Sequence, residues 1–207
     1  MADAQTDETG SAAGLAALIA RAAAQTNGKD KGPPPVERWN PPFCGDIDME
    51  IRSDGTWFYM GSPIGRQPLV RLFSTVLRKD EDGRTYLVTP VEKLGIRVVD
   101  APFVAVEMNV SEREGERVIT FRTNVGDIVE AGPEHPLRFV VHGENNELKP
   151  YLHVRGRLEA LVSRAVMYDL VALGETVDVD GISMFALRSG GQVFPVMPAG
   201  ELEALSS

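Results

Sequence analysis

The chain has 207 residues, of which 43% are hydrophobic and 25% charged, so it can bury one large core or two small ones. Its formal net charge of −9 opposes nonspecific binding to nucleic acid or to an anionic membrane, and no stretch reaches the roughly 20 apolar residues of a membrane helix. One cysteine excludes an internal disulfide, and three scattered histidines argue against a metal site. The acidic N-terminus lacks the basic region of a secretory signal, so we expect a cytoplasmic protein without membrane insertion.

The first segment predicts a helical arm. In residues 11–25, Ser11 can cap a helix whose apolar face carries Leu15, Leu18, Ile19 and Ala22. The proline run at 33–35 indicates a stiff linker. We therefore expect an N-terminal helical arm with a Pro-rich linker over residues 1–35.

A first unit of antiparallel strands with one main helix is expected over residues 36–101. Residues 46–52 alternate between apolar and charged side chains, and 53–55 is a turn before a return strand at 56–60. Apolar residues at helical spacing predict a helix over 66–78. Further strands are predicted at 85–89 and around 96–98.

A second unit of the same kind is expected over residues 102–199, followed by a C-terminal tail over 200–207. Strands at 103–110 and 117–123 predict a hairpin, and a loop runs through 124–136. Strands at 137–141 and 148–155 lead to a helix predicted over 157–173, which Gly174 ends. Strands near 176–179, 182–188 and 192–196 close the α+β fold.

The order hairpin, helix, strands therefore occurs twice. A shift of 92 residues places Tyr59 on Tyr151 and Leu69 on Leu161. We interpret this as a diverged duplication, with generic hairpin-plus-helix patterning as the alternative. Two such units would pack about an interface, and domain interfaces are frequent ligand sites.

Five segments resemble one bacterial family. They are residues 43–47, 69–73, 86–92, 100–103 and 155–164. Through them, about residues 35–198 resemble the domain-of-unknown-function family 1285 (DUF1285), which is uncharacterised. The resemblance implies a duplicated α+β core whose second half is superficially like pleckstrin-homology domains. It also implies a nucleotide-like ligand between the halves and a role in signal transduction, and it supplies no catalytic residues.

The preferred candidate site is the start of the helix predicted over 157–173. Arg155, Gly156 and Arg157 would lie where a strand passes into a helix N-terminus, whose free N–H groups and dipole favour an anion. On a helical wheel Arg164 and Tyr168 each fall within about 20° of Arg157. These arginines could hold a phosphate group. A local arginine–glutamate network is the alternative.

Further site residues are assigned around this helix. Tyr168 or Tyr151 could stack on a base. Arg66 occupies a comparable helix start in the first unit, whereas Arg71 and Arg78 fall opposite the apolar stripe and are expected to be solvated. Thr123 and Asn124, in a glycine-containing loop, could bind the hydrogen-bonding edge of a ligand, although an ordinary turn is favoured.

Catalysis finds little support in the sequence. No P-loop, dinucleotide-binding fingerprint or Gly-x-Ser-x-Gly elbow occurs. Cys44 could be a nucleophile, but a small core residue is the favoured interpretation. Asp46, Asp48 and Glu50 could recruit a cation, but the solvated side of an edge strand is favoured.

The sequence thus predicts a cytoplasmic module that binds a small anionic ligand, such as a nucleotide, between its two halves. No metal and no nucleic-acid partner are expected. The first alternative is a protein-interaction adaptor without a small ligand, and the second is an enzyme with an unrecognised site.

Overall fold

A computed structural model describes residues 12, 14–17, 19, 20, 34–142 and 147–201 of the chain. The chain divides into two compact units, Met1–Asp100 (unit 1) and Ala101–Ser207 (unit 2). Among the described residues, no helix is long and apolar enough to cross a membrane.

The described residues before position 21 are helical, and three of them, Leu15, Ala16 and Ile19, are buried. The rest of the helix predicted over 11–25, including Ser11, Leu18 and Ala22, lies outside the described residues.

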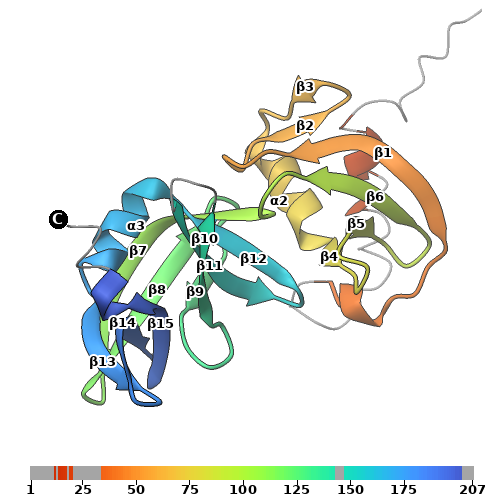
Figure 1. The fold of residues 1–207 in the computed structure, drawn as a ribbon. Helices are drawn as coiled ribbons and strands as arrows, with labels where there is room; N and C mark the ends of the chain where they lie inside the picture. Colours follow the sequence, from red (N-terminus) through yellow and green to blue (C-terminus); the bar gives the residue numbers. More distant parts are fainter. Residues whose placement is uncertain (1–11, 13, 18, 21–33, 143–146, 202–207) are drawn as a thin grey trace, which may run out of the picture. The chain divides into compact units, whose positions relative to one another are not determined.

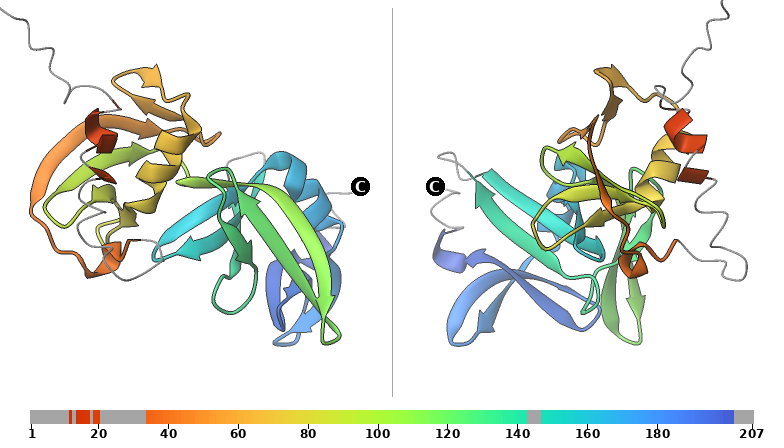
Figure 2. Two further views of the ribbon diagram at one scale, coloured as in Figure 1. Left: turned by 180° about the vertical axis from the view of Figure 1, so that it is seen from behind. Right: turned by 90° about the vertical axis from the view of Figure 1, so that its right-hand side faces the viewer.

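Unit 1 holds a six-stranded sheet and one α-helix. The strand order is β3-β2-β1-β6-β5-β4, and the central pair, β1 with β6, is parallel. Strand β1 curves strongly, and the helix α2 lies inside the curve (Figures 1 and 2). The elements are the 3-10 helix η2 (Val36–Arg38), β1 (Phe43–Ile51), β2 (Trp57–Tyr59), β3 (Ser62–Pro63), α2 (Gln67–Thr75), β4 (Leu77–Lys79), β5 (Thr85–Val88) and β6 (Lys93–Val98).

The core of unit 1 forms where α2 meets the sheet. Phe73 on α2 is fully buried and stacks on Trp57 of β2, with ring centroids 6.1 Å apart. The predicted helix over 66–78 is too long at its C-terminal end, because Leu77 begins strand β4 and pairs with Leu87 of β5. Val76 precedes that strand, and its β-branched side chain suits the change to extended backbone.

Unit 2 holds a six-stranded sheet, a three-stranded sheet and one α-helix. The larger sheet has the order β10-β11-β12-β7-β8-β9, with β12 and β7 parallel; the smaller has the order β13-β14-β15. The elements are β7 (Phe103–Arg113), β8 (Glu116–Thr123), β9 (Ile128–Glu130), β10 (Leu137–His142), β11 (Glu147–Arg155), β12 (Leu158–Val162), α3 (Arg164–Val171), β13 (Glu175–Val179), β14 (Ile182–Ser189) and β15 (Gln192–Pro198).

The helix predicted over 157–173 is wrong in its first half. Residues 158–162 form β12, in which the buried Leu158, Ala160 and Val162 alternate with less buried neighbours. That period of two marks a strand, and only α3 is helical. Ser163 caps α3 by accepting a hydrogen bond from the Val166 amide. Within the predicted loop over 124–136, the structure also forms the short strand β9.

The two six-stranded sheets share one strand order. Numbered along the chain within each sheet, the strands lie in the order 3-2-1-6-5-4, and the first and sixth strands form a parallel pair at the centre. Their fourth and fifth strands also repeat two residue pairs. The pair Leu77–Leu87 corresponds to Leu137–Leu152, and Arg78–Tyr86 corresponds to Arg138–Tyr151.

This shared order supports the predicted duplication but overturns the predicted offset. Leu77 and Leu137 begin equivalent strands and are 60 residues apart. The shift of 92 instead matches Leu69 of helix α2 with Leu161 of strand β12. The helices are also not equivalent, since α2 precedes the fourth strand of its sheet and α3 follows the sixth.

The three-stranded sheet packs against β8 and β10 of the larger sheet. Phe185 and Leu187 of β14 are buried, and Ser189 joins the layers with two hydrogen bonds. Its hydroxyl donates to the Ala131 carbonyl (2.7 Å) and accepts from the Ile119 amide (2.8 Å). The likeness to pleckstrin-homology domains stays a prediction.

Candidate functional site

The segment Arg155-Gly156-Arg157 is a turn between two strands and not a helix start. Gly156 has φ +54° and connects β11 to β12. Arg157 precedes β12 and Arg164 follows it, so the strand separates them by about 20 Å. The predicted anion site, built on one helix face, is therefore wrong in its geometry.

Five of the predicted site residues do come together, at the end of the larger sheet where β7 begins. Arg155 donates to Asp127 (Nη1 to Oδ2, 2.9 Å) and lies 4.8 Å above the buried Phe103 ring. Gly156 and Arg157 form the adjacent turn, and β8 ends beside it at Thr123. The predicted site residues at this end are Arg155, Gly156, Arg157, Thr123 and Asn124.

Thr123 and Asn124 serve the turn that follows β8. The hydroxyl of the fully buried Thr123 accepts from the Asp127 amide (3.0 Å). The side-chain oxygen of Asn124 accepts from the Val104 amide (3.0 Å), and the Asn124 amide donates to the Val104 carbonyl (2.8 Å). These polar atoms are engaged in backbone bonds, in agreement with the turn interpretation.

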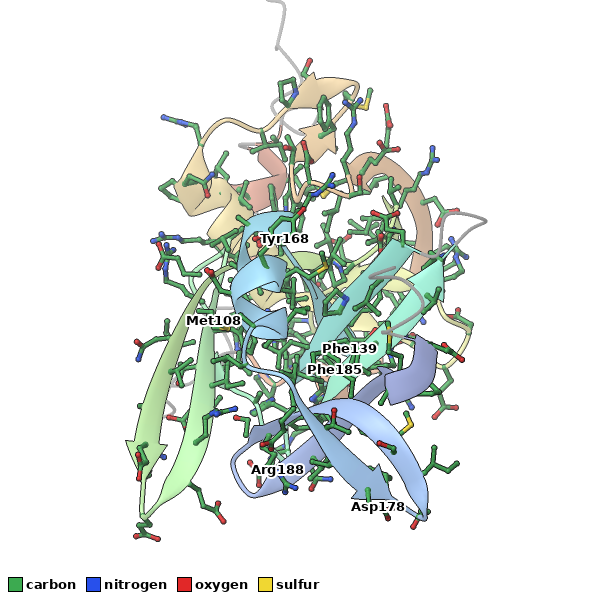
Figure 3. The ribbon with its side chains drawn as sticks, turned by 60° about the vertical axis from the view of Figure 1, so that its left-hand side comes forward. Met108, Phe139, Tyr168, Asp178, Phe185 and Arg188 are labelled. Carbon is green, nitrogen blue, oxygen red and sulfur yellow. The ribbon has the colours of Figure 1, made fainter. Side chains whose placement is uncertain are left out.

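The other predicted site residues lie elsewhere. Arg164 and Tyr168 are on α3, where the guanidinium donates to the phenol oxygen (3.3 Å); Tyr168 is 61% exposed (Figure 3). This hydrogen bond raises the pKa of Arg164. Tyr151 is buried, and the guanidinium carbon of Arg138 lies 4.5 Å from the centroid of the tyrosine ring. Arg66 precedes α2 in unit 1 and is exposed.

The expectation that Arg78 is solvated is wrong. Arg78 is 8% exposed and donates to the Val36 and Trp39 carbonyls (2.9 and 2.7 Å) and to Asp80 (2.6 Å). Burial raises the pKa of Asp80, but the hydrogen bonds and charges of Arg78 and Lys93 outweigh it and lower the pKa. Arg78 thus holds the 3-10 helix η2 against β4, which is the edge strand of the sheet in unit 1.

Two minor predictions about β1 also change. Cys44 is exposed and not a core residue. Strand β1 lies inside the sheet and not at its edge. Asp46 and Glu50 pair with arginines, Asp46 with Arg84 and Glu50 with Arg52 and Arg97. Within the described part of the chain, no group of three metal-ligating side chains comes together.

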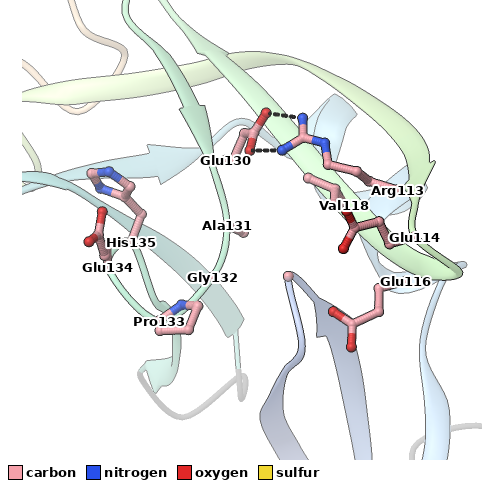
Figure 4. Close-up of a pocket in the computed structure, with 11 residues that line it drawn as sticks. Arg113, Glu114, Glu116, Val118, Glu130, Ala131, Gly132, Pro133, Glu134 and His135 are labelled. Carbon is pink, nitrogen blue, oxygen red and sulfur yellow. Dashed lines mark hydrogen bonds and ion pairs between the residues drawn. The ribbon is translucent and has the colours of Figure 1, made fainter.

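A pocket of about 540 Å³ lies in unit 2, and sequence reasoning did not predict it. One wall is the tip of the β7–β8 hairpin, and the opposite wall is the loop between β9 and β10 (Figure 4). Gly190, in the β14–β15 turn, completes it. A Cβ at Gly190 would lie 3.1 Å from the Ala131 carbonyl oxygen, and its φ is +56°, so this close approach needs glycine. The lining residues are Arg113, Glu114, Glu116, Val118, Glu130, Ala131, Gly132, Pro133, Glu134, His135 and Gly190.

Carboxylates dominate the chemistry of this pocket. Arg113, its one guanidinium, is committed to Glu130 by two hydrogen bonds of 3.1 and 2.9 Å. That bidentate contact lowers the pKa of Glu130 and raises the pKa of Arg113. No residue that the structure describes gives a hydrogen bond or ion pair to the carboxylates of Glu114, Glu116 and Glu134. The charge of Glu114 also helps to raise the pKa of Arg113, but among the described residues only Glu130, of the four lining glutamates, forms an ion pair with it.

The sequence features that form this pocket are recognisable one by one, but they lie far apart in the chain. The hairpin tip Glu112-Arg113-Glu114-Gly115-Glu116 is rich in glutamate, and Gly190-Gly191 marks a tight turn. Nothing in the sequence shows that positions some 75 residues apart share one pocket.

Comparisons with known proteins place this fold in a family. The model "Domain of unknown function (DUF1285), N-terminal domain" matches residues 34–101, and "Protein of unknown function (DUF1285), C-terminal domain" matches residues 102–196. The chain belongs to the DUF1285 family. The predicted resemblance is thereby confirmed, and the two family domains correspond to the two units of the fold.

Two crystal structures of DUF1285 proteins are similar to this chain. One, from Silicibacter pomeroyi DSS-3, is 49% identical, with 93% of this chain and 98% of that chain covered and a TM-score of 0.81. Another, from Shewanella baltica OS155, is 24% identical, with 60% of this chain and 90% of that chain covered and a TM-score of 0.48. No curated protein matches the chain.

Proposed function

We propose that this DUF1285 protein is a small-ligand-binding module, and that its second unit binds a molecule with a positively charged group in the pocket of unit 2. The observation that carries the proposal is that Glu114, Glu116 and Glu134 line one open space, and that their carboxylates make no hydrogen bond or ion pair with another described residue. The pocket volume of about 540 Å³ lies within the range of about 300–1,000 Å³ typical of small-molecule sites.

An ammonium or guanidinium group suits this lining because it donates several hydrogen bonds and carries the complementary charge. A hydrogen bond to a charged group contributes roughly 1.5–3 kcal/mol, at the lower end here because the pocket is open to water. Two walls on separate elements would let a ligand with two amino groups contact both Glu116 on the hairpin and Glu134 on the loop.

A thermal-shift and calorimetric series with putrescine, spermidine and agmatine tests the proposal. We expect spermidine to raise the unfolding temperature, since a ligand at 100 times its Kd stabilises the native state by about 2.7 kcal/mol. Glu116→Gln should weaken binding about tenfold, and added salt should weaken it further.

Glu112→Gln is the matched control. It removes the same charge from β7, near Glu114 in sequence but outside the pocket lining. Equal effects of Glu112→Gln and Glu116→Gln would mean that only the net charge of −9 attracts the amine. No stabilisation by any of the three amines would contradict the proposal.

A second candidate function is the predicted binding of an anionic ligand, such as a nucleotide, in a cytoplasmic signalling role. The gathering of Arg155, Gly156 and Arg157 beside Thr123 at one end of the larger sheet favours it, as does the predicted likeness of the second half to pleckstrin-homology domains. A thermal-shift screen against nucleotides tests it, with Arg157→Ala expected to abolish any shift. If neither amines nor nucleotides bind, the protein-interaction adaptor becomes the better hypothesis.

A further inference from the structure

His153 of β11 has a carbonyl oxygen at each of its two ring nitrogens. Nδ1 lies 3.0 Å from the main-chain carbonyl oxygen of Glu134, and Nε2 lies 2.7 Å from that of Gly156. A carbonyl oxygen only accepts hydrogen bonds, so each contact requires a hydrogen on the ring nitrogen. A neutral imidazole carries one such hydrogen and an imidazolium carries two. Only the protonated ring can make both bonds.

The two carbonyls belong to different segments. Glu134 lies on the loop between β9 and β10, and Gly156 lies in the turn between β11 and β12. The loop also approaches β11 through its backbone, because the His153 amide donates to the Pro136 carbonyl (3.0 Å). The side chain of His153 therefore adds a second tie to a loop that already contacts the strand.

His135 strengthens this contact from the loop side. Its ring stacks on the His153 ring with centroids 5.7 Å apart and planes 24° apart, and its Nδ1 lies 3.2 Å from the His153 carbonyl oxygen. Gly132 and His135 close the loop with reciprocal main-chain hydrogen bonds of 3.1 and 3.2 Å. The segment from Gly132 to His135 is thus joined at its two ends, and it lines one wall of the pocket.

Several charged groups surround the ring. Glu159 on β12 is the cross-strand partner of His153, and its carboxylate accepts two hydrogen bonds from Arg138. A carboxylate at this register position complements an imidazolium. The other titratable or charged groups on neighbouring elements are Glu134 and His135 on the loop, Arg155 on β11 with its partner Asp127, and Arg157 in the turn.

We propose that His153 is a proton-dependent clamp that fixes the β9–β10 loop, and with it one wall of the pocket of unit 2. As imidazolium it ties the Glu134 carbonyl to the Gly156 carbonyl. On losing a proton it keeps the hydrogen on Nε2, where the contact is shorter, and releases Glu134. The consequence for ligand binding rests on the proposed function, whereas the clamp itself does not.

NMR of the full chain without ligand tests the clamp between about pH 5.5 and pH 8, where histidines titrate. We expect the amide signals of Gly132, Glu134 and His135 to move together with the His153 ring signals. The amide of residue 153 donates to the Pro136 carbonyl of the loop, so its exchange rate, corrected for the intrinsic pH dependence, should rise about tenfold as the ring loses its proton. His153→Gln should remove both effects, because the amide of glutamine does not gain or lose a proton in this pH range.

His142→Gln is the matched control, since His142 is exposed at the end of β10, and it should leave both effects unchanged. A His153 ring that keeps one neutral tautomer across this range, or loop signals that do not follow it, would overturn the clamp.

The coupling to the pocket is tested separately in the His135→Gln background, which removes the second titrating ring. Spermidine affinity should change at least threefold across the pH range and lose this dependence when His153→Gln is added. The same pH dependence in both proteins would overturn the coupling. Failure of spermidine to bind would instead contradict the proposed function, while the loop signals still decide the clamp.

Discussion

Units 1 and 2 share one strand order but differ in the side chains that their sheets carry. The clearest difference is in one row of cross-strand neighbours that crosses four strands of each sheet. In unit 1 the row across the fourth, fifth, sixth and first strands is Arg78, Tyr86, Gly95 and Asp46. In unit 2 the equivalent row is Arg138, Tyr151, Leu161 and Val104. The arginine–tyrosine pair is kept, and Gly95 and Asp46 are replaced by the apolar Leu161 and Val104.

The difference concerns what each arginine does. Arg78 is buried and binds backbone carbonyls of η2, so it closes the edge of its sheet. Arg138 remains at the surface, where its side chain is 51% exposed and pairs with Glu159. Unit 2 instead adds a second sheet, and the turn of that sheet supplies Gly190 to the pocket. The strand order is therefore a common scaffold, and the pocket of unit 2 is formed by a hairpin tip and a loop of that scaffold together with one turn of the added sheet.

Phe73→Ala should have the largest effect on stability. Phe73 has no exposed surface and stacks on Trp57, so removing its ring leaves a cavity at the centre of unit 1. Such substitutions cost about 3–5 kcal/mol. Urea denaturation followed by tryptophan fluorescence measures the loss, and a loss below about 1 kcal/mol would contradict the assigned core.

Substituting the two equivalent arginines tests the comparison directly. Arg78→Ala leaves carbonyls of η2 and the carboxylate of Asp80 without their buried donor, which should cost about 3 kcal/mol. Arg138→Ala removes an exposed ion pair and should cost about 1 kcal/mol or less. Equal losses in urea denaturation would show that the arginines have the same role in both units.

The cap of α3 is expected to contribute less. Ser163→Ala removes the hydroxyl that accepts from the Val166 amide, and loss of such a cap costs about 1 kcal/mol. Ser163→Asp keeps an acceptor and should restore most of the stability. A loss with Asp equal to that with Ala, measured by thermal unfolding, would exclude the capping role.

The smallest predicted effect is a pH dependence from Asp80. Because its pKa is lowered in the folded state, its ion pairs stabilise the protein fully above the ordinary value of 3.8, and this contribution is lost as the pH falls below it. Asp80→Asn should therefore be less stable than the natural chain at pH 6, and the difference should shrink toward pH 2. A difference that is independent of pH would contradict the assigned ion pairs.

Sequence patterns predicted β1 because apolar and charged side chains alternate along it, and predicted the β7–β8 hairpin because two strand-like runs flank the turn at 112–115. Residues 158–162 were misjudged because Leu158, Leu161 and Val162 fit helical spacing as well as a half-buried strand, and a five-residue run does not separate the two periods. The burial of Arg78 was not predictable, since it depends on carbonyls about 40 residues earlier.

The candidate site was less predictable than the fold. Local motifs pointed to Arg155, Gly156 and Arg157, and the predicted helix that was to bring Arg164 beside them does not form there. The pocket of unit 2 is made by a hairpin tip, a loop and a turn, which only the packing of the two sheets brings together. Local patterns do not encode that packing.

The most direct test of the central claim is NMR mapping of the residues that respond to spermidine on the full chain. We expect shifts confined to the hairpin tip at residues 113–118, the loop at 130–135 and the turn at 190–191, and we expect them to be lost in the Glu114→Gln, Glu116→Gln double variant. Shifts centred on unit 1 or on residues 155–157, or no saturable shift at all, would contradict it.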